Sequence, residues 1–250
     1  MPPPAFLLRE PRPRRAARNL SPGNSYLTNF IQRTWRRLMG NNTTAAAHSP
    51  TLIVLEGNND IQFLRRLSRI LHVADRAVPD LGQWEQQGRI VFMPLGGGDA
   101  LWPWTLRLAN LNCRAFYLYD REVSPFTEQR QQTVNILNQR PNCRAFLTTK
   151  RSLENYLHPR AIHEATGIQI EFGDDDAVAT LVAMQRFAAS HPQGDWLQLA
   201  PRSRQKMRQR VKAVLNTLAV EQMTSQRLLE CDPAGEVRMW FSTIRELTAG

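Results

Sequence analysis

The segment Thr51–Asp60, TLIVLEGNND, constrains the fold of this chain more than any other stretch. Its aliphatic run ends abruptly at Glu56-Gly57, and a continuous apolar run bounded by turn residues predicts a buried strand of a parallel sheet. Asn58-Asn59-Asp60 are helix-capping types, and apolar residues follow at helical spacing: Ile61, Phe63, Leu64, Leu67 and Leu71. One carboxylate therefore lies at the carboxyl end of a strand and another at the start of the next helix. In open α/β sheets this is the edge where ligands bind.

The chain alternates strands and helices after this segment. Three further apolar runs predict strands, over Arg89–Leu95, Ala115–Tyr119 and Arg144–Thr149. Helical spacing connects them over Asp99–Leu111 and Glu128–Gln139. Because strands separated by helices of this length form right-handed crossovers, we expect a mostly parallel, Rossmann-like α/β sheet in a domain over residues 51–160.

Past Ser152 the pattern predicts helices and no further strand. Three helices are expected, over Asp174–Ala189, Ser203–Ala219 and Ala234–Leu247, and they define a helical C-terminal subdomain over residues 161–250. The middle helix is strongly basic, with Arg202, Arg204, Lys206, Arg208, Arg210 and Lys212 and no acid among them. This density of positive charge predicts a surface that contacts phosphate, although part of it is ordinary solvation.

The first fifty residues form a basic arm. They hold eight arginines and one acid, which places +7 of the chain's net charge of +10 here. Met1–Gly23 is rich in proline and arginine and is predicted to lack fixed structure until bound. Tyr26–Met39 reads as a basic amphipathic helix that could dock on the domain, on nucleic acid or on a membrane surface. Asn41–Pro50 is a polar linker.

The charge of the chain points to a polyanionic partner. All basic side chains except Lys150, Lys206 and Lys212 are arginines, whose planar group suits bidentate contact with phosphate, and nucleic acid is the commonest such partner. The three cysteines are far apart in sequence, show no metal-ligand spacing and suit a reducing cytoplasm. No apolar run approaches the roughly 18 to 20 residues that span a membrane, so no membrane partner is expected.

Charged side chains recur where the predicted strands end. Glu56 follows the first strand, Asp120 and Glu122 the third, and Lys150 and Glu154 the fourth. If the third strand continued through Asp120-Arg121-Glu122, the i, i+2 spacing would place both carboxylates on one side. Clustered carboxylates without histidine or cysteine favour Mg²⁺ or Mn²⁺, and a pair of such ions can activate water at a phosphodiester. For any one of these acids alone, a helix cap or a salt bridge to an arginine is the more ordinary role, and it is their recurrence at the same sheet edge that favours a metal site.

Other chemistries find less support in the sequence. Gly96-Gly97-Gly98 could cradle a phosphate or merely allow a tight turn, and it lacks the lysine of an ATP-binding P-loop. No GxSxG nucleophile motif is present. The five histidines form no metal-type cluster, and His158 and His163 are expected at the surface of a helix. A receiver-like phosphoacceptor fold would use Asp120 but would not need Glu56, Asp60 and Glu154 together.

Four segments together resemble the TOPRIM domain: EGNND after a strand, the glycine run after the next, the YDRE segment and KRSLENYL. Within that superfamily they most resemble the OLD-type endonucleases and related small nucleases of phage defence and mobile elements. The resemblance covers roughly Thr51 to Pro159, and DPAGEVRMWFSTI at Asp232–Ile244 is similar to the tail of such proteins.

The resemblance implies roles for individual residues. It assigns Glu56 to the metal site and to proton transfer, Asp60 as a nearby ligand, and the remaining acids as metal ligands: Asp120, Glu122 and Glu154. A basic residue that holds the scissile phosphate would be Lys150, Lys206 or Lys212. The implied cofactor is Mg²⁺ or Mn²⁺ as two ions, and the implied activity is hydrolysis of DNA or RNA, with DNA favoured.

The chain departs from the OLD-type pattern because no ATPase precedes the predicted TOPRIM portion. Any control by ATP would require a separate ATPase partner. Two hypotheses follow for a cytoplasmic protein that could also form a homo-oligomer: a metal-dependent nuclease, or a nucleic-acid-binding regulatory subunit whose acidic site is inactive or conditional. Metal-dependent turnover separates the two.

Overall fold

The computed structural model describes residues 49–96, 103, 105, 107, 108 and 113–249. The predicted basic arm and amphipathic helix lie outside these residues, as do Gly97, Gly98 and most of the helix expected over 99–111. Within that helix Pro103, Thr105, Arg107 and Leu108 are helical. Residues 48–250 form one compact unit.

A four-stranded, all-parallel sheet lies at the centre of this unit. Its strands are β1 (Thr51–Leu55), β2 (Ile90–Pro94), β3 (Ala115–Tyr119) and β4 (Cys143–Leu147), in the order β2-β1-β3-β4. Val54 lies beside Met93 on one side and Tyr117 on the other, so the carboxyl ends of the inner strands are level. The predicted parallel α/β sheet is confirmed, with each strand boundary within two residues of the expected one.

Alternate residues of the two inner strands face two separate hydrophobic cores. Ile53 and Leu55 of β1 belong to one core together with Phe116 and Leu118 of β3. Leu52 and Val54 belong to the other core together with Tyr117 and Tyr119. Because successive side chains of a strand point to opposite faces, a strand that is apolar throughout requires cover on both faces.

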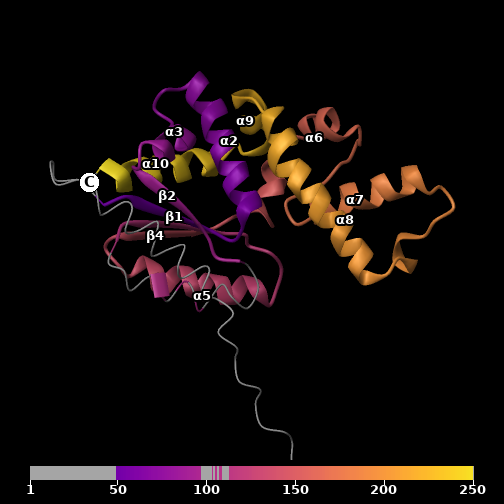
Figure 1. Ribbon diagram of the computed structural model, residues 1–250, viewed down its shortest axis with the longest axis horizontal. Helices are drawn as coiled ribbons and strands as arrows, with labels where there is room; N and C mark the ends of the chain where they lie inside the picture. The colour runs from indigo at the N-terminus through magenta and orange to yellow at the C-terminus, as the bar shows by residue number, and fades with distance from the viewer. Residues whose placement is uncertain (1–48, 97–102, 104, 106, 109–112, 250) are drawn as a thin grey trace, which may run out of the picture. The chain divides into compact units, whose positions relative to one another are not determined.

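Helices provide that cover (Figure 1). On one face lie α2 (Asn58–Ala74), α3 (Leu81–Gln86) and α10 (Glu236–Ala249), whose apolar residues join the core of Ile53 and Leu55. On the other face lies α5 (Phe126–Asn138), whose Val134 and Leu137 pack on Tyr117 and Tyr119. The amphipathic pattern after Glu56 forms α2 as expected, and the short α3 was not expected from the sequence.

The C-terminal half is helical, as predicted. It contains the 3₁₀ turn η2 (Leu153–Tyr156), α6 (Pro159–Thr166), α7 (Val178–Ser190), the 3₁₀ turn η3 (Trp196–Gln198), α8 (Pro201–Val214), the π-helical turn η4 (Leu215–Ala219) and α9 (Ser225–Cys231). These helices share the core of Ile53 and Leu55 through residues such as Leu153, Leu215 and Trp240. The C-terminal helices and the sheet therefore pack around common hydrophobic residues.

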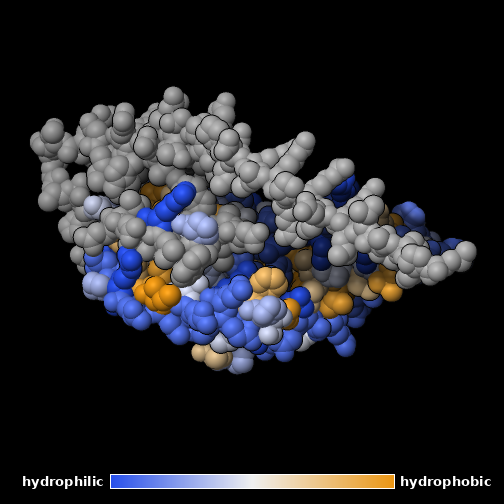
Figure 2. Space-filling model, turned by 90° about the horizontal axis from the view of Figure 1, so that it is seen from below, coloured by the Kyte–Doolittle hydropathy of each residue, from blue (hydrophilic) through white to orange (hydrophobic). Residues whose placement is uncertain are grey.

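The surface of the described part is mixed in character. The face seen in Figure 2 is largely hydrophilic, with separate hydrophobic side chains between the polar ones. Large exposed apolar side chains include Val73, Phe126, Leu197 and Leu229. Among the described helices none is long and apolar enough to cross a membrane.

Candidate functional site at the carboxyl edge of the sheet

The candidate site lies where the strand order reverses. The chain passes from β1 to β2 on one side and then returns to β3 on the other side of β1. The carboxyl ends of β1 and β3 therefore form a topological switch point, the position at which open α/β sheets bind ligands. Glu56 follows β1 and Asp120 follows β3, and the backbone N–H of Asp120 donates to Oε1 of Glu56 at 3.1 Å.

Asp60 lies in the first turn of α2, beside Glu56. Its Oδ2 accepts a hydrogen bond of 2.8 Å from the backbone N–H of Gly57, which caps the helix. Its Oδ1 is buried and accepts no hydrogen bond from any described group. One oxygen therefore holds the helix, and the other keeps its lone pairs for a cation.

Asp120 and Glu154 lie close together because the turn η2 packs against the carboxyl end of β3. The backbone N–H of Leu153 donates to Oδ1 of Asp120 at 3.1 Å. The same turn buries Glu154, of which only 2% is exposed. The acid expected after the fourth strand thus reaches the acids that follow the first and third strands.

Lys212 of α8 lies among these acids. Its Nζ is 3.4 Å from Oε1 of Glu154, 3.7 Å from Oδ2 of Asp120 and 3.8 Å from Oδ1 of Asp60. These distances give coulombic attraction but exceed those of good hydrogen bonds. One ammonium therefore offsets part of the negative charge of three carboxylates without occupying all their lone pairs.

The other two candidate lysines lie elsewhere. Lys150 pairs with Asp174 at 2.7 Å and lies over the ring of Tyr156. Lys206 is exposed on α8. Of the three lysines between which the sequence did not decide, only Lys212 contacts the acids.

A π-helical turn positions one further polar side chain. Asn216 in η4 is fully buried, and its Nδ2 donates to Oε1 of Glu154 at 2.5 Å and to the carbonyl of Lys212 at 2.8 Å. Its Oδ1 has no hydrogen-bond partner among the described groups. Sequence reasoning missed Asn216, because no local pattern separates a π-turn from the α-helix around it; π-turns are frequent at functional sites.

Arg130 of α5 is the second residue that sequence reasoning missed. It pairs with Glu56 at 2.9 Å and also donates to the backbone carbonyl of Asp120. Both members of the pair are largely buried, with 13% and 14% of their side chains exposed. Arg130 thus fixes Glu56 against the end of β3, and only its place on a helix after the YDRE segment could have suggested this.

Three of the site acids, Glu56, Asp60 and Asp120, have pKa values above those of free carboxylic acids. Burial raises the pKa of Glu56 from 4.5 to about 7, opposed by Arg130 and reinforced by Asp60. Burial likewise raises the pKa of Asp60 from 3.8 to about 6, and that of Asp120 well above its ordinary value. Burial lowers the pKa of Lys212, but Glu154, Asp120, Asp60 and Glu56 outweigh it, so the net shift is upward and the ammonium stays charged. Strong shifts of this kind are a mark of functional sites.

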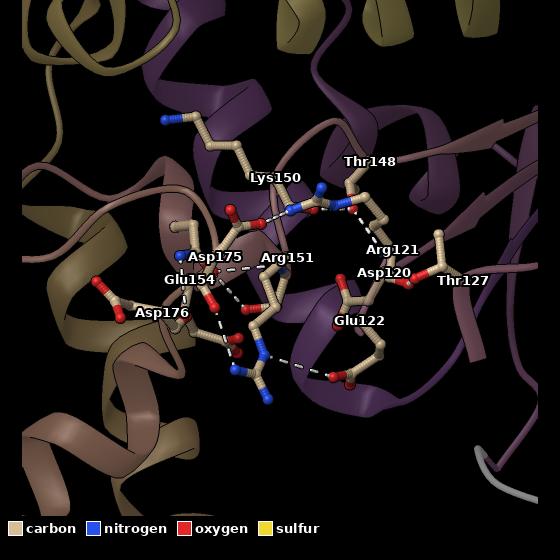
Figure 3. A network of polar contacts seen from close by, with 12 residues as sticks. Asp120, Arg121, Glu122, Thr127, Thr148, Lys150, Arg151, Glu154, Asp175 and Asp176 are labelled. Atoms are coloured by element: carbon tan, nitrogen blue, oxygen red, sulfur yellow. Dashed lines mark hydrogen bonds and ion pairs between the residues drawn. The ribbon is translucent and has the colours of Figure 1, made fainter. Parts of the chain in front are cut away.

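Glu122 does not join Asp120 in the way the strand argument required. β3 ends at Tyr119, and Glu122 adopts a positive φ of 56°, so the i, i+2 geometry of a strand does not apply. Figure 3 shows its carboxylate directed toward Arg151, with Oε2 3.8 Å from Nε. The predicted metal ligand therefore lies on the outer side of the site, beside an arginine.

The donor chemistry of the site fits a hard divalent cation. Glu56, Asp60, Asp120 and Glu154 supply carboxylate oxygens, and Asp60 and Asn216 each retain a buried oxygen without a hydrogen-bond partner. When all are ionised, the four carboxylates outnumber the two cations Lys212 and Arg130, so the site carries a net negative charge.

The arrangement of the side chains is a separate matter. In the part of the chain that the structure describes, no three His, Cys, Asp or Glu side chains are positioned to hold a metal ion together. Binding of an ion would therefore require the carboxylates to rearrange, together with the Lys212 ammonium that lies among three of them.

Comparisons with known proteins do not assign this chain to a family. It matches no family model, and neither the curated proteins nor the solved structures include a significant match. We therefore infer its function from the geometry of the site.

Proposed function

We propose that this chain is a metal-dependent nuclease of the TOPRIM type that hydrolyses phosphodiester bonds of nucleic acid. The observation that carries the proposal is the meeting of Glu56, Asp60, Asp120 and Glu154 around Lys212 at the switch point of the sheet. Three of these buried acids share the single ammonium of Lys212, and Glu56 beside them pairs with Arg130. The basic character of the chain supports a phosphate-bearing substrate.

The four acids would hold Mg²⁺ or Mn²⁺, with the Asn216 oxygen as a further donor. The chemistry that such an ion would supply is Lewis-acid activation of water and neutralisation of charge on the phosphate. Glu56, fixed by Arg130 at the end of β1, would accept the proton of the attacking water. The water oxygen forms a bond to phosphorus as the bond from phosphorus to the leaving oxygen breaks.

Lys212 has a second role in this proposal. Once a divalent cation balances the acids, its ammonium is free to contact a non-bridging oxygen of the scissile phosphate. It lies on α8, the helix with the highest density of basic side chains. Preorganised positive charge of this kind typically contributes a factor of about 100 to 1,000 in rate.

A cleavage assay tests the proposal. Plasmid DNA, single-stranded DNA and tRNA are incubated with Mg²⁺, Mn²⁺ or EDTA and either the wild type, Asp120→Asn or the control Glu246→Gln. Asn can still accept the hydrogen bond from Leu153, and Glu246 is exposed on α10. We expect metal-dependent cutting that Asp120→Asn abolishes and Glu246→Gln retains. Full activity of Asp120→Asn would refute the site assignment.

One observation favours a conditional form of the same function. Lys212 contacts three of the acids that would hold the ion, which is the arrangement expected of a site that is held inactive. The chain would then be a nucleic-acid-binding subunit whose cleavage depends on a separate ATPase partner. Salt-sensitive binding of nucleic acid with no cleavage under any metal condition would select this alternative.

A further inference from the structure

A cavity of about 260 Å³ opens beside the acidic site. Glu154 and Lys212 line both, so the cavity and the acids are continuous. Its other walls come from the turn after β3, the start of η2, the start of α7 and one face of α8. This volume is slightly below the range of roughly 300 to 1,000 Å³ for small-molecule sites, so the cavity suits one small ligand or a single nucleotide unit.

One wall of the cavity is a single polar face of α8. The residues that line it are at positions i, i+3, i+4 and i+7 of the helix: Gln205, Arg208, Gln209 and Lys212. Arg208 is exposed and forms no ion pair with any described residue, which leaves its guanidinium free for a ligand. The two glutamines can each donate and accept hydrogen bonds, as the edge of a nucleobase requires. The exposed Arg202, Lys206 and Arg210 of the same helix do not line the cavity.

The opposite wall carries Arg151. Its Nη1 donates to the backbone carbonyl of Asp175 at 3.1 Å, and its Nε lies 3.8 Å from Glu122, as Figure 3 shows. These contacts hold the side chain in place while 26% of it stays exposed. Arg151 and Arg208 thus place two guanidinium groups on the same cavity, and guanidinium groups bind phosphate in bidentate geometry.

The lining of the cavity between these walls suits an anion as well. Ala177 is the N-cap of α7, a helix of 13 residues, and Val178, Ala179 and Thr180 form its first turn. The small side chains at this point allow close approach to the helix terminus, whose dipole favours negative charge. The cavity therefore combines two arginines that can contact a phosphate with two glutamine amides that can contact a base.

We propose that this cavity binds one unpaired nucleotide of the substrate strand, next to the phosphate at the acidic site. Arg208 and Arg151 contact its phosphate, and Gln205 and Gln209 contact its base. The inference rests on the proposed function, and it makes the substrate a single strand, or a strand end or loop, rather than an intact duplex. Glu122 positions Arg151 in this site instead of holding a metal ion.

Binding measured in EDTA tests the proposal independently of cleavage. Fluorescein-labelled single-stranded DNA, single-stranded RNA and duplex DNA are titrated with the wild type, Arg208→Ala, Arg208→Lys and the control Arg210→Ala. Arg210 is an exposed arginine of the same helix outside the cavity. A nucleoside 5′-monophosphate serves as competitor, with inorganic phosphate and the uncharged nucleoside alongside it.

We expect Arg208→Ala to weaken single-strand binding about tenfold and to lower the salt slope of log K by about 0.7, the share of one phosphate contact. Arg208→Lys should restore the salt slope but only part of the affinity, and Arg210→Ala should stay within twofold of the wild type. The monophosphate should compete better than phosphate or nucleoside, and this advantage should disappear in Arg208→Ala. Comparison of the titrations with single-stranded DNA and single-stranded RNA shows whether the cavity accepts deoxyribose, ribose or both.

Two outcomes would overturn the proposal. One is equal weakening by Arg208→Ala and Arg210→Ala, which would indicate unspecific attraction to a basic helix. The other is tighter binding of duplex than of single strands. Failure of the proposed function gives a different result from both. If the wild type binds single strands through Arg208 but never cleaves them, the nuclease proposal is refuted and the nucleotide-binding site is retained.

Discussion

Two clusters of buried acids in this molecule differ in how their oxygens are satisfied. Asp232 caps α10, with its two oxygens accepting from the backbone N–H groups of Glu236 and Val237 at 3.0 and 2.8 Å. Glu236 accepts from the backbone N–H of Thr149 at 3.0 Å, from the Thr149 hydroxyl and from the Tyr156 hydroxyl. Every carboxylate oxygen of this cluster has a neutral donor.

The acids at the sheet edge lack such complete partners. Asp60 keeps a buried oxygen without a hydrogen bond, and its neighbours share the single ammonium of Lys212. Desolvation raises the pKa values of Glu56, Asp60 and Asp120. Buried acids whose oxygens are all filled by neutral donors stabilise a fold, whereas buried acids with free lone pairs are available to a ligand.

The largest expected effect is on cleavage, which should depend on the acids at the sheet edge and on Lys212 but not on the cluster of Asp232 and Glu236. Lys212→Met should reduce cleavage by a factor of about 100 to 1,000, because it removes the ammonium that is proposed to contact the scissile phosphate; about 3 to 4 kcal/mol of transition-state stabilisation corresponds to that factor. The matched control is Lys206→Met, an exposed lysine on the same helix. Comparable activity of both variants under saturating Mg²⁺ would remove Lys212 from the mechanism.

The next effect is on the free energy of unfolding, which should depend more on the cluster of Asp232 and Glu236 than on the acids at the sheet edge. Glu236→Ala should lower the free energy of unfolding by about 3 kcal/mol, because three donors lose their acceptor in the interior. Asp120→Asn should cost far less, since Asn keeps the acceptor for Leu153. Urea unfolding of the two variants and of the control Glu246→Ala measures this. A Glu236→Ala variant as stable as the wild type would show that the first cluster is not structural.

Asp60→Asn should stabilise the protein, in a manner that depends on pH. The folded state raises the pKa of Asp60 from 3.8 to about 6, so it binds this proton more tightly than the unfolded state. The wild type therefore loses stability as pH rises from about 4 to 6, and the penalty is complete above that range. The variant should gain about 3 kcal/mol at pH 8 and nothing near pH 4. Thermal unfolding across this range tests the sign, and a gain that is the same at both pH values would contradict the buried-charge explanation.

The smallest expected effect concerns metal binding. Mg²⁺ at ten times its dissociation constant should stabilise the wild type by about 1.4 kcal/mol, a rise of roughly 3 to 6 °C in Tm for a chain of this size. The rise should shrink below pH 6, where the acids bind protons instead, and should be absent in Asp120→Asn but present in Glu236→Gln. Equal stabilisation of both variants would place the ion away from the sheet edge.

A large part of the fold could be predicted from the sequence because it depends on local patterns. The apolar runs before Glu56 and Asp120 indicate buried strands, and the alternation of strands with helices indicates a parallel sheet. Since the carboxyl ends of parallel strands meet at one edge, the approach of Glu56 to Asp120 followed from the topology. The strand argument for Glu122 did not hold, because the chain turns to a positive φ there rather than continuing extended.

Other features of the site depend on contacts between residues far apart in the chain. Lys212 meets Asp60 across about 150 residues, and Arg130 meets Glu56 across 74. No periodicity in a single sequence distinguishes Lys212 from Lys206, because both lie on one basic helix and only the packing of α8 determines which side chain turns inward. The sequence alone determined the parallel sheet and its acidic edge. The tertiary structure decided which cation balances the acids and which arginines face the adjoining cavity, because these choices depend on how the C-terminal helices pack against that edge.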